Sequence, residues 1–171
     1  MSTVSEIESL KNKLALERAK MTDAIAAWPR QELERPFLDG WSVKDLVAHV
    51  ANSEALNVKF AKLMLECDEP VQVQAVAADY PDYTGPFELD RFNAYMTDKL
   101  RGRSFDVVVQ TLRETRDATL AWMDTLTPEQ LERKGTHAAW GEQSVRAMLK
   151  VLVLHDKMHT RDIIKGPSPR E

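Results

Sequence analysis

Apolar residues recur at steps of three, four and seven positions through most of the chain, which is the spacing of amphipathic helices. Four long segments carry this pattern, at residues 5–28, 42–64, 104–126 and 144–164. Serines stand at their starts, and Ser5 with Glu8 and Ser42 with Asp45 have the spacing of helix N-terminal caps. A shorter amphipathic segment spans residues 87–100. Four long helices with one apolar stripe each predict an all-α four-helix bundle.

The segment between the second long helix and the short one has no clear helical pattern. Residues 71–76 alternate between apolar and polar, but they lie between Pro70 and Pro81, so we expect irregular loop rather than strand across 67–86. Loops of this length in a compact domain are usually functional or mobile. Tyr80, Tyr83 and Phe87 therefore either cover one end of the bundle as a lid or pack on a dimer partner.

The two halves of the chain resemble each other weakly. Each half has a long helix, a proline-led turn with Leu-Glu-Arg, a tryptophan, a capping serine and a helix with histidine. The corresponding residues are Trp28-Pro29, Leu33-Glu34-Arg35, Trp41, Ser42 and His49 in the first half, and Thr127-Pro128, Leu131-Glu132-Arg133, Trp140, Ser144 and His155 in the second. The repeat predicts two helical hairpins related by a pseudo-twofold axis, with His49 and His155 close to that axis.

Composition narrows the class of protein. A chain of 171 residues with 43% hydrophobic residues fits one domain, here 1–171 with a core at about 5–164. The net charge of −4 disfavours a nucleic-acid binder, which would carry a basic surplus. No apolar run reaches the roughly 20 residues that span a bilayer, and the first residues lack a signal-peptide pattern. With the single Cys67 excluding an internal disulfide, we expect a cytoplasmic protein.

Three of the four histidines lie on predicted inward faces. His155, His159 and Asp162 fall within about 60° of one another on a helix, and two histidines one turn apart can bind one ion. His49 flanks the apolar stripe of the second long helix, where Ser53 and Asn57 continue a polar track. A metal site and ordinary core histidines are both compatible with this pattern. His137, in a polar stretch, is expected in a loop.

Two segments together resemble the DinB/YfiT superfamily of metal-binding helical bundles. They are Gly40-Trp-Ser-Val-Lys-Asp-Leu-Val-Ala-His49-Val and Leu154-His155-Asp-Lys-Met-His159-Thr-Arg-Asp162. The resemblance implies a four-helix bundle, usually a homodimer, that binds one divalent nickel, zinc or iron ion. It also implies that the ligands are one histidine of the second long helix and two of the fourth, here His49, His155 and His159. Some members of this superfamily use the metal together with a small cofactor thiol.

Other polar residues are candidates for supporting roles. Asp162 is the candidate catalytic residue, as a base or as a group that orients an imidazole or a bound nucleophile. Glu54 is a weaker candidate, expected on the exposed face. Arg116, on the apolar stripe of the third long helix, either binds a substrate carboxylate or forms an internal ion pair. Asn57 and Arg116 are the predicted substrate-binding residues.

Three histidines without a fourth protein ligand would leave positions open on the metal, as in catalytic sites. The sequence therefore predicts a metal-dependent enzyme acting on a small molecule, a thiol-dependent S-transferase or a related hydrolase. The alternative is a non-catalytic bundle, metal-stabilised or metal-free, that binds a small molecule or a protein partner.

Overall fold

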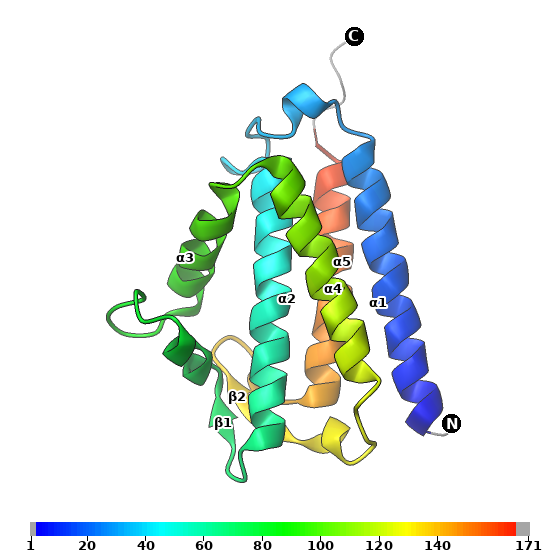
Figure 1. Cartoon of the computed structure of the whole chain (residues 1–171), viewed down its shortest axis with the longest axis vertical. Helices are drawn as coiled ribbons and strands as arrows, with labels where there is room; N and C mark the ends of the chain where they lie inside the picture. The colour runs from blue at the N-terminus through cyan, green and yellow to red at the C-terminus, as the bar shows by residue number, and fades with distance from the viewer. Residues whose placement is uncertain (1–2, 167–171) are drawn as a thin grey trace.

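The computed structural model describes residues 3–166, and its architecture is a bundle of four long helices. These are α1 (Thr3–Ala26), α2 (Val43–Glu66), α4 (Phe105–Met123) and α5 (Val145–Ile164). In Figure 1, α1 and α5 run upward while α2 and α4 run downward, and the shorter α3 (Leu89–Arg101) lies on the outer side of α2. Helix α5 packs against both α1 and α2, and α4 packs against α2. Within residues 3–166 no helix combines the length and apolarity needed to cross a membrane.

Serine caps define the starts of three of these helices. Ser42 and Asp45 exchange hydrogen bonds in a capping box, in which Asp45 N donates to Ser42 Oγ and Ser42 N donates to Asp45 Oδ2. Ser104 and Ser144 accept in the same way from the backbone amides three residues further on. The capping box predicted at Ser5 is wrong, because α1 already begins at Thr3.

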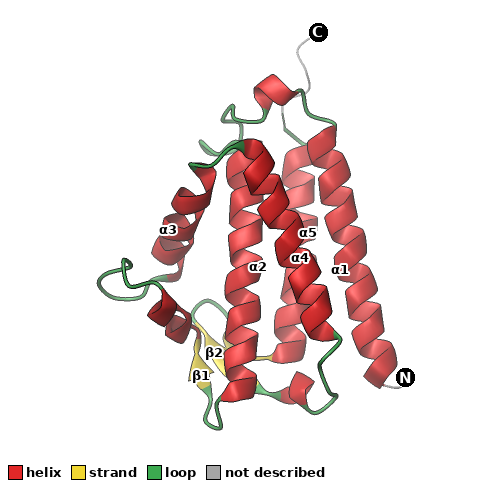
Figure 2. Cartoon of the chain, viewed as in Figure 1, coloured by secondary structure: helices red, strands yellow, loops and turns green. Residues whose placement is uncertain are grey.

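A small sheet closes the lower end of the bundle, where no strand was expected (Figure 2). Strand β1 (Val71–Gln72) pairs in parallel with β2 (Lys134–His137), and β2 pairs antiparallel with β3 (Gly141–Ser144). Gly135 is required here, because a Cβ atom would lie 2.8 Å from the Val71 carbonyl oxygen and 2.9 Å from the Phe60 ring. The prediction of irregular loop at 71–76 is therefore wrong in part. After β1 the chain forms a 3₁₀ segment, Val73–Asp79.

Aromatic residues of the segment 67–86 pack within the same chain. The Tyr80 ring lies 5.4 Å from Phe92 of α3, and the Tyr83 ring lies 5.0 Å from Phe92 and 5.4 Å from Tyr95, between ring centroids. Phe87 is 5.4 Å from the same Phe92 ring. These rings therefore have an apolar environment within their own chain, while a lid role and a dimer contact of the same residues stay predictions.

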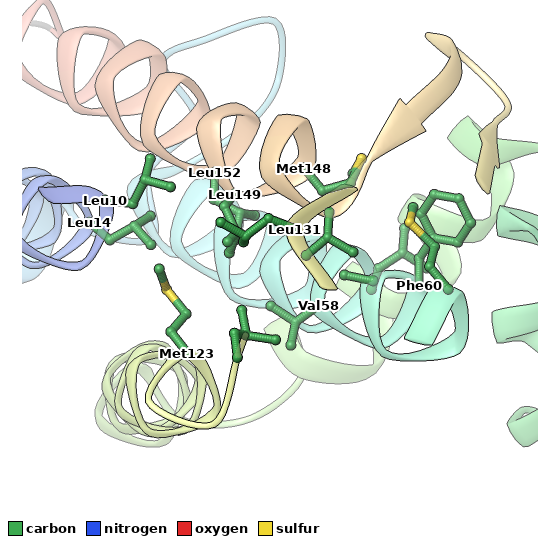
Figure 3. Packing of buried hydrophobic residues seen from close by; sticks show 14 of the residues in the cluster. Leu10, Leu14, Val58, Phe60, Met123, Leu131, Met148, Leu149 and Leu152 are labelled. Atoms are coloured by element: carbon green, nitrogen blue, oxygen red, sulfur yellow. The ribbon is translucent and has the colours of Figure 1, made fainter. Parts of the chain in front are cut away.

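The core consists of two apolar clusters stacked along the bundle. The lower cluster includes Leu14, Phe60, Met123 and Leu152, and Figure 3 shows these side chains converging from different helices. The upper cluster draws on the other halves of the same helices. Its fully buried members include Met21, Val47, Leu112 and Ile163. Each of the four long helices has buried charge between its lower-cluster and upper-cluster positions, namely Arg18 together with Glu17 on α1, Glu54 on α2, Arg116 on α4 and Asp156 on α5.

Candidate metal centre

Three histidine rings from two helices converge on one point in the upper half of the bundle. The Nε2 atom of His155 lies 3.2 Å from Nε2 of His49 and 3.2 Å from Nε2 of His159. One ligand atom from each histidine falls within 4.8 Å of the other two. The structure therefore brings together the three residues predicted as metal ligands.

Helix geometry explains this convergence. His155 and His159 are one turn apart on α5, so their rings share a face. His49 reaches them from α2, which packs against α5 in the antiparallel direction. The edge-to-face contact between Trp41 and His49, with ring centroids 5.3 Å apart, supports the His49 ring from the chain segment just before α2.

The histidines are neutral at physiological pH. Burial, together with the neighbouring imidazoles, lowers the pKa of His49 to about 4 and the pKa of His155 to about 3. Burial also lowers the pKa of His159, although Asp162 acts in the opposite direction. Neutral imidazole is the form that binds metal ions, so no proton has to be displaced at pH 7.

Asp162 fixes the orientation of one ligand. Its Oδ2 atom lies 3.0 Å from Nδ1 of His159, so the ring donates its Nδ1–H to the carboxylate and keeps the Nε2 lone pair free. Asp162 thus positions the His159 ring. On His49, the Ser53 hydroxyl lies 3.5 Å from Nδ1. Catalytic action of Asp162 on a substrate stays a prediction.

The donor set fits a divalent ion. Two nitrogens bound at roughly 2.1 Å to one ion, at angles of roughly 90–109°, are separated by roughly 3.0–3.4 Å. The two Nε2 separations of 3.2 Å lie in this range. Each neutral imidazole has a single N–H donor, and that of His159 is donated to Asp162, so the three rings cannot satisfy all of their nitrogen lone pairs by hydrogen bonding to one another. A cation placed between them would interact favourably with all three lone pairs. Zinc, nickel and iron(II) all accept imidazole nitrogen.

Arg116 does not face this cluster. Its guanidinium donates to both carboxylate oxygens of Glu54, at 2.9 and 3.0 Å, to Asp156 Oδ2 at 3.0 Å and to the Leu14 carbonyl oxygen. The internal ion pair is thus the alternative that the structure favours, and the Arg116 side chain is only 4% exposed. A substrate contact of Arg116 stays a prediction. Glu54 is 1% exposed, so its expected position on the outer face is wrong.

Arg116 belongs to a buried group that we call the charged tetrad. It consists of Arg18 on α1, Glu54 on α2, Arg116 on α4 and Asp156 on α5, with side chains 2–6% exposed. Arg18 donates to Glu54 Oε2 at 2.6 Å and to the two oxygens of Asp156 at 3.0 Å each. Burial alone would raise the pKa of Glu54, but the two guanidiniums hold it below its ordinary value. Apart from Arg116 and Glu54, the sequence analysis did not identify this group, because its members are far apart in the chain.

Asn57 and His137 lie elsewhere. Asn57 is buried, its Nδ2 donates to the Ser53 carbonyl oxygen at 2.9 Å, and its Oδ1 has no partner among the described residues. A substrate contact of Asn57 stays a prediction. His137 is buried at the end of β2 and stacks on Trp140 with ring centroids 3.9 Å apart, so its expected loop position is wrong. It is not part of the histidine cluster.

A four-helix bundle that presents three convergent histidines from two helices defines a class of metal-binding proteins, and comparisons with known proteins agree with this class. The family model of the DinB superfamily matches residues 13–163. The chain belongs to the DinB superfamily.

Relatives in several Bacillus species carry the name "putative metal-dependent hydrolase". The one from Bacillus mycoides strain KBAB4 is 25% identical over 164 residues, covering 94% of this chain and 80% of the relative. One from Bacillus cereus strain 03BB102 is 25% identical over 161 residues, with the same coverage.

Solved structures share the fold. YfiT from Bacillus subtilis, described as a probable metal-dependent hydrolase with an unusual four-helix bundle topology, superposes with a TM-score of 0.68 at 21% identity, covering 93% of this chain and 84% of YfiT. A mycothiol-dependent maleylpyruvate isomerase superposes with a TM-score of 0.73 at 13% identity, covering 92% of this chain and 60% of the isomerase. At these identities the likeness establishes the fold alone.

Proposed function

We propose that this protein is a divalent-metal-dependent enzyme that activates a small nucleophile, in the first place a low-molecular-weight thiol for S-transfer and alternatively water for hydrolysis. The observation that carries the proposal is the convergence of three neutral imidazole nitrogens, with 3.2 Å between Nε2 of His155 and each of the other two. The names of the Bacillus relatives support metal dependence, and the likeness to a mycothiol-dependent isomerase supports a thiol.

The chain's own residues would supply an oriented site with free coordination positions. His49, His155 and His159 would hold the ion, and Asp162 keeps His159 in the tautomer that binds through Nε2. When bound, a divalent ion supplies Lewis-acid chemistry, lowering the pKa of water to about 7 or stabilising a thiolate. The cluster of possible ligands contains three histidines and no further Cys, Asp or Glu among the described residues, which leaves positions for substrate and nucleophile.

Metal analysis followed by cobalt substitution tests the proposal. Protein purified without a histidine tag is expected to contain about one divalent ion per chain, or to bind one after incubation with nickel, zinc or iron(II). The visible spectrum of the cobalt(II) form is expected to change when cysteine, used as the probe thiol, is added. If the protein binds none of these ions, the proposal is overturned in favour of a metal-free bundle. If the cobalt(II) spectrum does not change on addition of thiols or anions, the site is closed and structural.

Two turnover assays separate the candidate reactions. Transfer of the probe thiol to a small electrophile, and hydrolysis of a p-nitrophenyl ester without thiol, are measured on the same metal-loaded protein. The His155→Ala variant is the control in both assays, because loss of a ligand should remove metal-dependent turnover of either kind. Thiol-dependent turnover alone supports the S-transferase, and hydrolysis alone supports the hydrolase.

We also propose that the protein forms a homodimer through the outer face of α5. Leu154 and Met158 are 63% and 50% exposed and lie one helical turn apart, next to the histidine ligands.

A further inference from the structure

We propose that the charged tetrad is the positioning device of the metal centre: it fixes α2 against α5 and so sets the distance between His49 and His155. The inference rests on the proposed function, since it concerns the geometry of the same three ligands. It assigns a role to Arg18, Glu54, Arg116 and Asp156. Among the residues that the structure describes, none of these four hydrogen-bonds to a ring of the histidine cluster.

The argument begins with the origin of the ligands. His155 and His159 belong to one helix, so their relative position follows from helix geometry, but His49 comes from another helix. A side chain binds a metal ion well only when the metal–ligand distance lies within about 0.2 Å of its preferred value. The site therefore depends on how far α2 is shifted or rotated relative to α5, which no local interaction determines.

The two carboxylates of the tetrad lie on the same helical turns as residues of the metal centre. Asp156 directly follows His155 in α5. Glu54 directly follows Ser53, whose hydroxyl lies 3.5 Å from Nδ1 of His49 in α2. A displacement of either carboxylate along its helix axis would thus move a ligand, or the residue that contacts a ligand, by nearly the same amount.

The tetrad has directional contacts that apolar packing lacks. Each arginine bridges both carboxylates: Arg18 contacts Glu54 at 2.6 Å and Asp156 at 3.0 Å, and Arg116 contacts Glu54 at 2.9 Å and Asp156 at 3.0 Å. Arg18 also donates to the Leu112 carbonyl oxygen of α4, at 2.8 Å. The apolar clusters above and below hold the helices together through the hydrophobic effect, which has no directional preference. Charge-assisted hydrogen bonds from planar guanidiniums are directional, because they weaken steeply with distance and angle.

The internal repeat of the sequence points to the same role. Glu54 and Asp156 each lie twelve residues after a capping serine, Ser42 and Ser144. Arg18 and Arg116 each lie fifteen residues before the leucine of a Leu-Glu-Arg turn. Each half of the chain thus contributes one arginine and one acid at equivalent positions.

His49 and His155, which the comparison of the two halves had paired, are not at equivalent positions, because they lie seven and eleven residues after their capping serines. When the two capping serines are aligned, Ser53 and Asn57 correspond to His155 and His159, and Val151 corresponds to His49. The tetrad is therefore common to both halves, while the metal ligands lie on one side of it. The two positive and two negative charges of the tetrad balance, although Arg18 lowers the pKa of His155 and Asp156 acts to raise the pKa of His159.

The experiment replaces the tetrad without leaving an unpaired buried charge. The quadruple variant Arg18→Met, Glu54→Leu, Arg116→Met, Asp156→Leu exchanges all four charges for apolar side chains, a kind of change that buried ion-pair networks often tolerate. We expect a folded helical protein by circular dichroism. Its cobalt(II) affinity should fall at least tenfold, its visible spectrum should shift or broaden, and the proton NMR contact between the His49 and His155 rings of the metal-free protein should weaken.

A conservative variant covers the case in which the quadruple variant does not fold. Glu54→Asp keeps the charge but shortens the side chain by one methylene, and it should lower cobalt(II) affinity about three- to tenfold with a shifted spectrum. The matched control is Leu131→Ala, a cavity in the lower cluster, where Leu131 is fully buried. This control should lower the melting temperature while leaving the cobalt(II) spectrum unchanged.

The outcomes separate this inference from the proposed function. If the parent protein binds cobalt(II) and both tetrad variants keep its spectrum and an affinity within twofold, the tetrad stabilises the fold only and the inference is wrong. The inference is equally wrong if Leu131→Ala shifts the spectrum as much as Glu54→Asp. If the parent protein binds no metal, the proposed function fails, and unchanged ring contacts in the metal-free tetrad variants would reject the inference independently.

Discussion

Nδ1 of His159 lies 3.0 Å from the carboxylate of Asp162, three residues further along α5, and this contact determines which nitrogen of the ring can bind an ion. A histidine that donates through Nδ1 presents its Nε2 lone pair, and Nε2 is the atom that approaches His155. The pair lies within a single helical turn, so it forms wherever α5 forms.

Replacement of Asp162 should weaken the metal centre without destroying it. Asp162→Ala removes the acceptor of the Nδ1–H group, and we expect metal affinity to fall roughly 10–100-fold, the usual cost of losing such a partner. Asp162→Asn keeps an acceptor oxygen and should cost less than about tenfold in affinity while lowering turnover. Competition titration with a chromogenic chelator measures both. Equal affinities for parent and Asp162→Ala would show that the contact is incidental.

Each of the three histidines should be required for metal binding. Alanine at His49, His155 or His159 removes one of three ligands, and we expect affinity to fall by at least about 100-fold, more than loss of an outer partner costs. His137→Ala is the matched control, because His137 is also buried but stacks on Trp140 away from the cluster. Isothermal titration with zinc is the measurement. A His49→Ala variant that binds as well as the parent would contradict a site built from two helices.

The metal-free protein should lose stability as the pH falls from about 6.5 towards 4. Burial lowers the pKa of His49 in the folded state to about 4, whereas in the unfolded chain this pKa is near its ordinary value of 6.5. Between these values the unfolded state binds more protons, so acidification favours unfolding. His155 and His137 are shifted in the same direction, mainly by burial.

Thermal unfolding in the presence of a chelator, at several pH values, measures this effect. The melting temperature of the parent should be nearly constant above pH 7 and should decrease below 6.5. In His155→Ala the decrease should be shallower, because one of the shifted groups is absent. A parent protein that gains stability on acidification through this range would show that the rings are not buried in the neutral form.

Removal of a single charge from the tetrad should be strongly destabilising. Asp156→Asn leaves Arg18 and Arg116 with one carboxylate between them, and an uncompensated buried charge costs about 3–5 kcal/mol. The comparison is Asp106→Asn, which breaks the exposed pair with Arg30 and should change stability by less than about 1 kcal/mol. Urea denaturation followed by circular dichroism gives both values. Similar small effects at the two positions would mean that water reaches the tetrad.

The proposed dimer predicts a concentration-dependent assembly through α5. Sedimentation at micromolar concentration should show twice the chain mass of 19.5 kDa for the parent. Met158→Lys should shift the species towards monomer, while Leu16→Lys, a comparable exposed leucine on α1, should not. A parent that sediments only as a monomer would reject the dimer.

The sequence alone predicted the four long helices and, together with the family resemblance, the three histidines that the structure brings together. Helices form through contacts within one turn, so apolar spacing and the capping serines Ser42, Ser104 and Ser144 predicted three helix starts correctly. The pair His155 and His159 follows from the same periodicity. The assignment of His49 to the same site came from resemblance, because no local rule relates two residues separated by 106 positions.

Only the tertiary structure decided which partners meet across the chain. Arg18 and Asp156 are 138 residues apart, and Val71 pairs with Gly135, so neither the tetrad nor the small sheet has a local signal. For the same reason, helical periodicity placed Arg116 on an inward face but could not tell that its guanidinium binds Glu54 and Asp156. Periodicity fixes the direction of a side chain on its own helix, whereas its partners depend on the packing of all four.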